Sequence, residues 1–184
     1  PVDMRQEGIC ARTSAINMNF RYMMSQVEVN VTSSDPSDDD YVNLTYCEVE
    51  LLNVGTAGEI ALSDRSATVT TDGQTYAMSN VGTSSVHYHD AMIPQTLVNA
   101  DSSNKVRFRI TVYKDDTHTE RDIYYADVAP IKVRVAGALT SAPVNAWESG
   151  VHYVYNLKIT KTEIKTTATL TDWTTVEASE DVWF

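Results

Sequence analysis

Residues 105–112 read KVRFRITV, so that charged or polar residues alternate with apolar ones. Successive side chains of a β-strand point to opposite faces, and this period of two predicts a strand with one buried and one solvated face. Val27, Val29 and Val31 alternate with polar neighbours in the same way. These two segments predict strands that cover a common apolar core, with the apolar side chains from Tyr153 to Ile159 on the same core.

Weaker patterns of the same kind recur along the chain. They predict strands at Ala15–Phe20, Val42–Leu52, Glu59–Val69, Ser85–Ile93, Ile123–Tyr125, Ile131–Val135, Tyr153–Thr160 and Ile164–Leu170. Polar, turn-rich segments separate them, and none is long enough to be an interdomain linker. Short strands at this spacing are typical of an antiparallel two-sheet β-sandwich of the transthyretin-like or Greek-key type. A chain of 184 residues is expected to form one such domain.

The charge of the chain argues against some partners. Its formal net charge is −11, which repels phosphate backbones, so no nucleic acid is expected. No apolar run approaches the roughly 18 residues of a transmembrane span. The sequence opens at Pro1 without an apolar targeting segment, so we expect a processed product whose leader lies upstream.

The two cysteines, Cys10 and Cys47, allow one disulfide at most. A bridge and two buried thiols are both compatible with this sequence. Cys10 does not fit the lipidated cysteine of a lipoprotein, because Gly8 and Ile9 before it depart from the usual pattern.

Two histidines could hold a metal ion. His87 and His89 are two residues apart, on one face of a predicted strand, and two imidazoles at that spacing can bind zinc. A third ligand is not identifiable, although His118, His152 or Asp90 could fold nearby. Surface or cross-strand histidines explain the pattern better, and no metal is predicted.

Two carboxylate patterns resemble functional sites but lack a residue that such a site needs. Glu48 and Glu50 share a strand face, as the acid and nucleophile of some glycosidases do, but Asn53 stands where a further carboxylate is needed. The aspartates of the first loop lack the glycine of a tight calcium loop, so a hydrated hairpin tip is predicted. They are Asp35, Asp38, Asp39 and Asp40. We therefore expect no catalytic residue, no cofactor and no enzyme.

Three stretches resemble the fimbrillin family, the pilins and pilin-like surface proteins of Bacteroides-type bacteria. Residues 147–159 (WESGVHYVYNLKI), followed by Ile164 and Trp173, are similar to the family's closing pattern. Residues 92–97 (MIPQTL) resemble its aliphatic-Pro-Gln segment, and residues 16–27 resemble the opening of its second domain, with Tyr22 where the family has His. The motif residues are expected to be structural. They are Pro94, Gln95, Trp147, Gly150, Tyr153, Tyr155 and Trp173.

The resemblance implies a subunit of a cell-surface fimbria that is made as a lipoprotein precursor, processed after export and polymerised by strand exchange. Its partners would be other pilin subunits, and it would be attached to the outer membrane through the precursor. Only the family's carboxyl-terminal domain is expected here, over residues 16–175, after an extension at 1–15. The alternative on the same fold is a tip adhesin or carbohydrate-binding module, with Tyr and Trp side chains as platforms for a glycan.

The tail at 176–184 is a candidate donor strand. Four of its apolar residues fall on one side of an extended chain, broken only by Glu180, and added to a neighbour's sheet edge they would fill pockets in its core. These residues are Val176, Ala178, Val182 and Phe184. Completion of the domain's own last strand is the other interpretation.

Overall fold

The structure is a computed structural model of the chain, and it describes residues 22–61, 63, 66–98, 105–129, 133–135, 138–139 and 143–172. These residues belong to one compact unit, Tyr22–Trp173. All of the regular structure within them is β-strand. The described residues therefore contain no helix that is long and apolar enough to cross a membrane.

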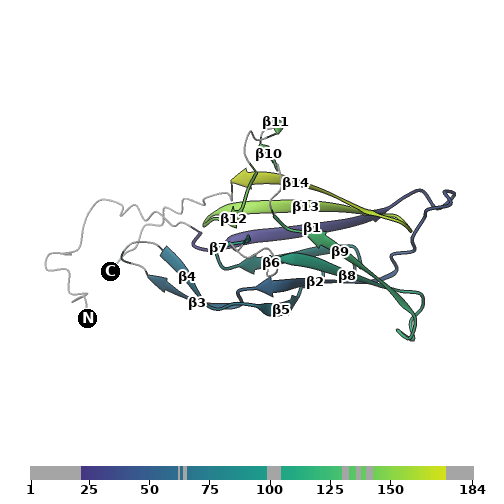
Figure 1. The fold of residues 1–184 in the computed structure, drawn as a ribbon, viewed down its shortest axis with the longest axis horizontal. Helices are drawn as coiled ribbons and strands as arrows, with labels where there is room; N and C mark the ends of the chain where they lie inside the picture. Colours follow the sequence, from purple (N-terminus) through teal and green to yellow (C-terminus); the bar gives the residue numbers. More distant parts are fainter. Residues whose placement is uncertain are drawn as a thin grey trace, which may run out of the picture. The chain divides into compact units, whose positions relative to one another are not determined.

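The larger sheet has six strands in the order β11-β10-β14-β13-β1-β6 (Figure 1). Its strands are β1 (Ser25–Ser33), β6 (His87–Met92), β10 (Val133–Val135), β11 (Ala138–Leu139), β13 (Val151–Ile159) and β14 (Ile164–Asp172). Val27, Val29 and Val31 of β1 are fully buried, whereas the residues between them lie on the outer face. The period of two in the sequence therefore corresponds to an inner and an outer side of this sheet.

The second sheet has four strands in the order β5-β2-β8-β9. They are β2 (Tyr46–Val54), β5 (Gln74–Ala77), β8 (Arg107–Tyr113) and β9 (Arg121–Asp127). Two short antiparallel pairs complete the described strands: β3 (Ala57–Ala61) with β4 (Ser66–Thr71), and β7 (Gln95–Thr96) with β12 (Ala146–Trp147).

The core lies between the two larger sheets, which form two layers in Figure 1. Phe108 of β8 packs edge-on against Tyr155 of β13, with ring centroids 5.1 Å apart. The hydroxyl of Tyr88 on β6 donates a hydrogen bond of 2.5 Å to the carbonyl of Cys47 on β2. These contacts join the sheets, and the predicted all-β sandwich is confirmed.

Two details of the predicted fold differ from the structure. The sheets are not antiparallel throughout, because β1 pairs in parallel with β13, and β10 with β14. A parallel pair requires a crossover, and here the chain passes through the other sheet between β1 and β13. The segment Glu59–Val69 was predicted as one strand but forms parts of β3 and β4, which fold back on each other.

Candidate functional site

A buried aromatic cluster joins β12 to β13. The indole Nε1 of Trp147 donates a hydrogen bond of 3.1 Å to the hydroxyl of Tyr155, and both side chains are about 1% exposed. The hydroxyl of Tyr153 accepts from the backbone N–H of Glu148 at 2.9 Å and donates to the carbonyl of Ala146 at 3.1 Å. Burial raises the pKa of Tyr153 to about 12, so the phenol stays protonated. These residues hold the chain before β13 against the core.

Gly150 forms the turn between these strands. Its φ of 75° lies in the left-handed region, where a residue without a Cβ is favoured. Its N–H donates to the carbonyl of Met24 at 2.9 Å, just before β1. The turn is therefore attached to the start of the neighbouring strand.

Gln95 links β7 to the bend between β2 and β3. Its amide oxygen accepts from the N–H of Gly55 at 2.7 Å, and its amide nitrogen donates to the carbonyls of Gly55 and Ile93 at 3.1 and 3.0 Å. Gly55 allows this approach, because a Cβ there would lie 3.0 Å from Gln95 Oε1 and 2.5 Å from Val69 Cγ1. The side chain of Gln95 thus acts as a structural cross-link beside Pro94.

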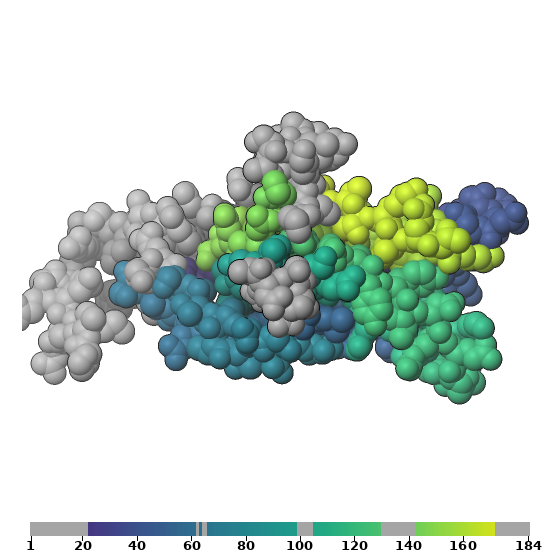
Figure 2. Space-filling model, viewed as in Figure 1, coloured from purple at the N-terminus to yellow at the C-terminus, as the bar shows by residue number. Residues whose placement is uncertain are grey.

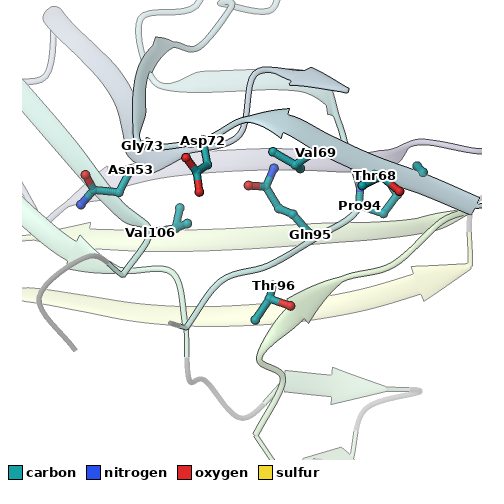
Figure 3. A pocket seen from close by; sticks show the side chains of 10 residues that line it. Asn53, Thr68, Val69, Asp72, Gly73, Pro94, Gln95, Thr96 and Val106 are labelled. Atoms are coloured by element: carbon teal, nitrogen blue, oxygen red, sulfur yellow. The ribbon is translucent and has the colours of Figure 1, made fainter. Parts of the chain in front are cut away.

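An open cavity of about 530 Å³ lies beside Gln95, between the β3–β4 hairpin and β7. Figure 3 shows Asn53, Asp72 and Val106 at one end of it, Thr68 and Pro94 at the other, and Gln95 and Thr96 between them. Asn53 lies where the pairing of β2 with β5 is irregular, and its φ is 59°. No pattern in the sequence predicts this cavity, because its lining comes from segments that are far apart along the chain.

A smaller cavity of about 390 Å³ lies at the base of the same hairpin and is more apolar. Its lining includes Met24, Ile60, Tyr76, Met92 and Ile93. All five residues of β3 are exposed, and Figure 2 shows this part of the chain, in blue to teal, at the surface. Ile60 is 47% exposed.

Three of the chain's four histidines gather around Glu28 on the outer face of the six-stranded sheet. One carboxylate oxygen of Glu28 lies 3.2 Å from His87 Nε2 and the other 3.0 Å from His152 Nε2. His89 contacts Gln26, and its ring centroid is 6.2 Å from that of His152. Burial alone would raise the pKa of Glu28, but the hydrogen bond from Asn30 and the charges of His152 and His87 lower it.

His152 is one of the residues that the sequence analysis named as able to approach His87 and His89, whereas His118 lies elsewhere, with its ring stacked on that of Tyr113. Among the described residues, no group of three or more His, Cys, Asp or Glu side chains is arranged to hold a metal ion. The histidine cluster is therefore a set of cross-strand contacts in this structure.

The carboxylates considered for catalysis make cross-strand pairs on β2. Glu50 accepts a hydrogen bond of 2.6 Å from Arg109 Nε, and Glu48 accepts one of 3.1 Å from the hydroxyl of Tyr113. In the first loop, Asp35 accepts two hydrogen bonds from Ser37, whose side chain and backbone lower the pKa of Asp35. In the same loop, the N–H of Asp38 donates to the carbonyl of Asp35 at 2.9 Å, and Lys161 donates to the carbonyls of Asp39 and Asp40 at 2.5 and 3.2 Å.

The aromatic side chains proposed as glycan platforms divide into two groups. Trp147, Tyr153 and Tyr155 are buried in the core, so they offer no face to a glycan. Tyr46 and Tyr125 are exposed at 36% and 46%, on the outer face of the four-stranded sheet.

Cys47 is a free, buried thiol whose burial raises its pKa to about 11. Cys10, Trp173 and the candidate donor strand with Val176, Ala178, Val182 and Phe184 lie outside the described residues.

Comparison with known proteins gives one family and several similar folds. The sequence profile of the family described as fimbrillin-like matches residues 5–173. Among proteins with curated descriptions, no relative is found. Similar solved structures include two proteins that are described as candidate cell adhesion proteins, one from Bacteroides uniformis and one from Bacteroides ovatus. The first is 19% identical with a TM-score of 0.60, and the second 15% identical with a TM-score of 0.53.

A third similar structure is the tip fimbrial protein Mfa3 from Porphyromonas gingivalis with a carboxyl-terminal truncation, at 14% identity and a TM-score of 0.53. The matches cover 84%, 84% and 83% of this chain but 52%, 46% and 52% of the three other chains. The chain therefore spans about half the length of the structures that it resembles. At these identities the likeness concerns the fold.

Proposed function

Because the chain belongs to the fimbrillin-like family, we propose that it is a structural or accessory subunit of a bacterial cell-surface fimbria. The observation that carries this proposal is the family match over residues 5–173, together with a sandwich core built on the family motif. The partners are other pilin subunits, and the role is assembly and support of adhesion rather than catalysis. The surface location and an outer-membrane lipoprotein precursor follow from the same proposal.

Assembly would proceed by strand exchange, with the tail at 176–184 as donor. In an extended chain, Val182 and Phe184 would share a side with Val176 and Ala178, whereas Ser179 would fall on the other side. Burial of each of the two apolar side chains in a neighbouring subunit would contribute roughly 1.5 to 3 kcal/mol before the cost of ordering the tail.

The test is to remove residues 182–184 and to measure both melting temperature and polymer formation with the full-length partner subunit. We expect an unchanged melting temperature and no polymer, because the donor contacts form only between subunits. Ser179→Ala is the matched control, since it changes the opposite side of the same segment, and it should polymerise normally. A shortened chain that unfolds, or that still polymerises, would refute the donor role.

A tip adhesin is the second candidate. It is supported by the proteins of similar fold, which are described as a tip fimbrial protein and as candidate cell adhesion proteins. The open cavity beside Gln95 also favours it, because a stalk subunit needs no ligand pocket. The two roles differ in whether the purified chain binds a host or bacterial ligand.

A further inference from the structure

We propose that the cavity between the β3–β4 hairpin and β7 is a binding site for a neutral saccharide, with Asp72 and Thr96 as principal polar contacts. The inference deepens the adhesin role and rests on it, because only a chain displayed at the cell surface would meet such a ligand. Its volume of about 530 Å³ lies within the range of ligand pockets.

The polar groups of the cavity come from separate segments. Asn53 belongs to β2, Thr68 to β4, Asp72 to the turn after β4, and Thr96 to β7. Figure 3 shows these side chains distributed around Gln95, with Asn53 and Asp72 to one side of it and Thr68 to the other. A small number of polar side chains converging from different elements is typical of a ligand site.

The walls of the cavity are held by hydrogen bonds that a ligand need not supply. Gln95 uses its amide on the backbone of Gly55 and Ile93. The amide nitrogen of Asn53 donates to the carbonyl of Lys105 at 3.2 Å. Val106 donates its N–H to the carbonyl of Leu97 at 3.1 Å. A site whose walls are already fixed loses little entropy when it binds.

The groups that remain available are those of Asp72 and the two threonines. In the part of the chain that the structure describes, no hydrogen bond or ion pair engages the Asp72 carboxylate or the hydroxyls of Thr68 and Thr96. A carboxylate accepts two neighbouring hydroxyl groups, and each threonine both donates and accepts. Because these groups are spread along the cavity, they can bind separate hydroxyl groups of a saccharide.

The remaining lining and the charge narrow the class of ligand. Ala67, Val69, Pro94 and Val106 offer apolar surface for the C–H groups of a sugar ring. Asp72 has no cationic side chain beside it in the lining, and the chain carries a net charge of −11. Anionic ligands are therefore disfavoured, and a neutral saccharide is favoured over a sialylated one.

The test uses the full chain and a defined panel of ligands. Lactose, maltotriose and chitotriose are the neutral probes, sialyllactose is the anionic probe, and a set of unrelated decapeptides represents peptide ligands. Binding is measured by saturation-transfer NMR and then by calorimetric titration of the ligands that score. The variants are Asp72→Asn and Thr96→Val, with Asp122→Asn as control, because Asp122 is an exposed carboxylate on β9 outside the cavity.

We expect at least one neutral probe to bind. Asp72→Asn should weaken that binding roughly tenfold, since a charged acceptor with two oxygens is replaced by a neutral amide with one, and Thr96→Val roughly two- to tenfold. Asp122→Asn should stay within twofold of the unmodified chain. The inference is overturned if no neutral probe binds, if only sialyllactose or peptides bind, or if Asp72→Asn and Asp122→Asn behave alike.

The same variants enter the polymer assay of the shortened tail, so that the two proposals fail separately. Absence of saccharide binding with normal polymer formation overturns the saccharide site alone. Absence of polymer from every chain, including the unmodified one with its partner subunit, overturns the fimbrial role. The side chains of Asp72 and Thr96 are exposed, so their replacement should leave the melting temperature unchanged. Equal melting temperatures of the variants would exclude unfolding as the cause of lost binding.

Discussion

Replacement of Tyr155 by phenylalanine tests whether the aromatic cluster stabilises the sandwich through a specific hydrogen bond. The change removes only the hydroxyl that accepts from Trp147 Nε1 at 3.1 Å, and both side chains are about 1% exposed. An indole N–H can only donate, so it would be left buried without its partner. Such a group costs about 1 to 3 kcal/mol, and we expect the free energy of unfolding to fall by about 2 kcal/mol.

The assay is urea unfolding at pH 7, with Tyr125→Phe as the matched control. With a slope of about 2 kcal/mol per molar urea, the midpoint should fall by about 1 M. Tyr125 is 46% exposed on the outer face, so its change should cost less than about 0.5 kcal/mol. Combining Tyr155→Phe with Trp147→Phe should show a coupling of at least about 0.5 kcal/mol. Equal costs for the two tyrosine variants would refute the argument.

Two further changes test the core and the histidine cluster. Phe108→Ala should lower the free energy of unfolding by about 3 to 5 kcal/mol, because Phe108 is fully buried between the sheets. Ile123→Ala, at an exposed site, is its control in the same urea assay. A small loss of stability in Phe108→Ala would contradict the packing. Glu28→Gln should cost roughly 0.5 to 1 kcal/mol at pH 7. The pKa of Glu28 is lowered on folding, so its contribution is present above the ordinary glutamate pKa of about 4.3 and is lost as pH falls through the lower folded value. Unfolding curves at pH 7 and pH 3 should therefore show the difference at pH 7 only, and an equal cost at both would contradict a stabilising role of the Glu28 carboxylate.

The inner faces of the main strands could be predicted because every second residue of a half-buried strand faces the core and is apolar. Phe108 and Ile110 of β8, and Leu157 of β13, are fully buried as the alternation indicates. The β3–β4 hairpin could not be found in this way. Its five-residue first strand is exposed throughout, so its sequence carries no alternation between apolar and polar residues.

The cavity and the cluster around Glu28 depend on contacts between distant parts of the chain. Glu28 meets His87 and His152, which lie on different neighbouring strands, and only the sheet order brings them together. Asp72 and Thr96 each read as ordinary turn or strand residues by themselves. The one local signal is Asn53, since asparagine adopts a positive φ more readily than most residues.

The parallel pairing of β1 with β13 affects the order in which the chain can fold. Asn30 and Asn156, which face each other across this pair, are 126 positions apart. Closing so long a loop is entropically costly, and folds dominated by such non-local pairings assemble slowly. One side of β1 can meet β6 early, but the other side has no partner until nearly all of the unit has been made. In an incomplete chain, the valine-rich strand β1 therefore has one unpaired edge, which is prone to aggregation. The sheet can be completed only after the carboxyl-terminal hairpin of β13 and β14 has been made.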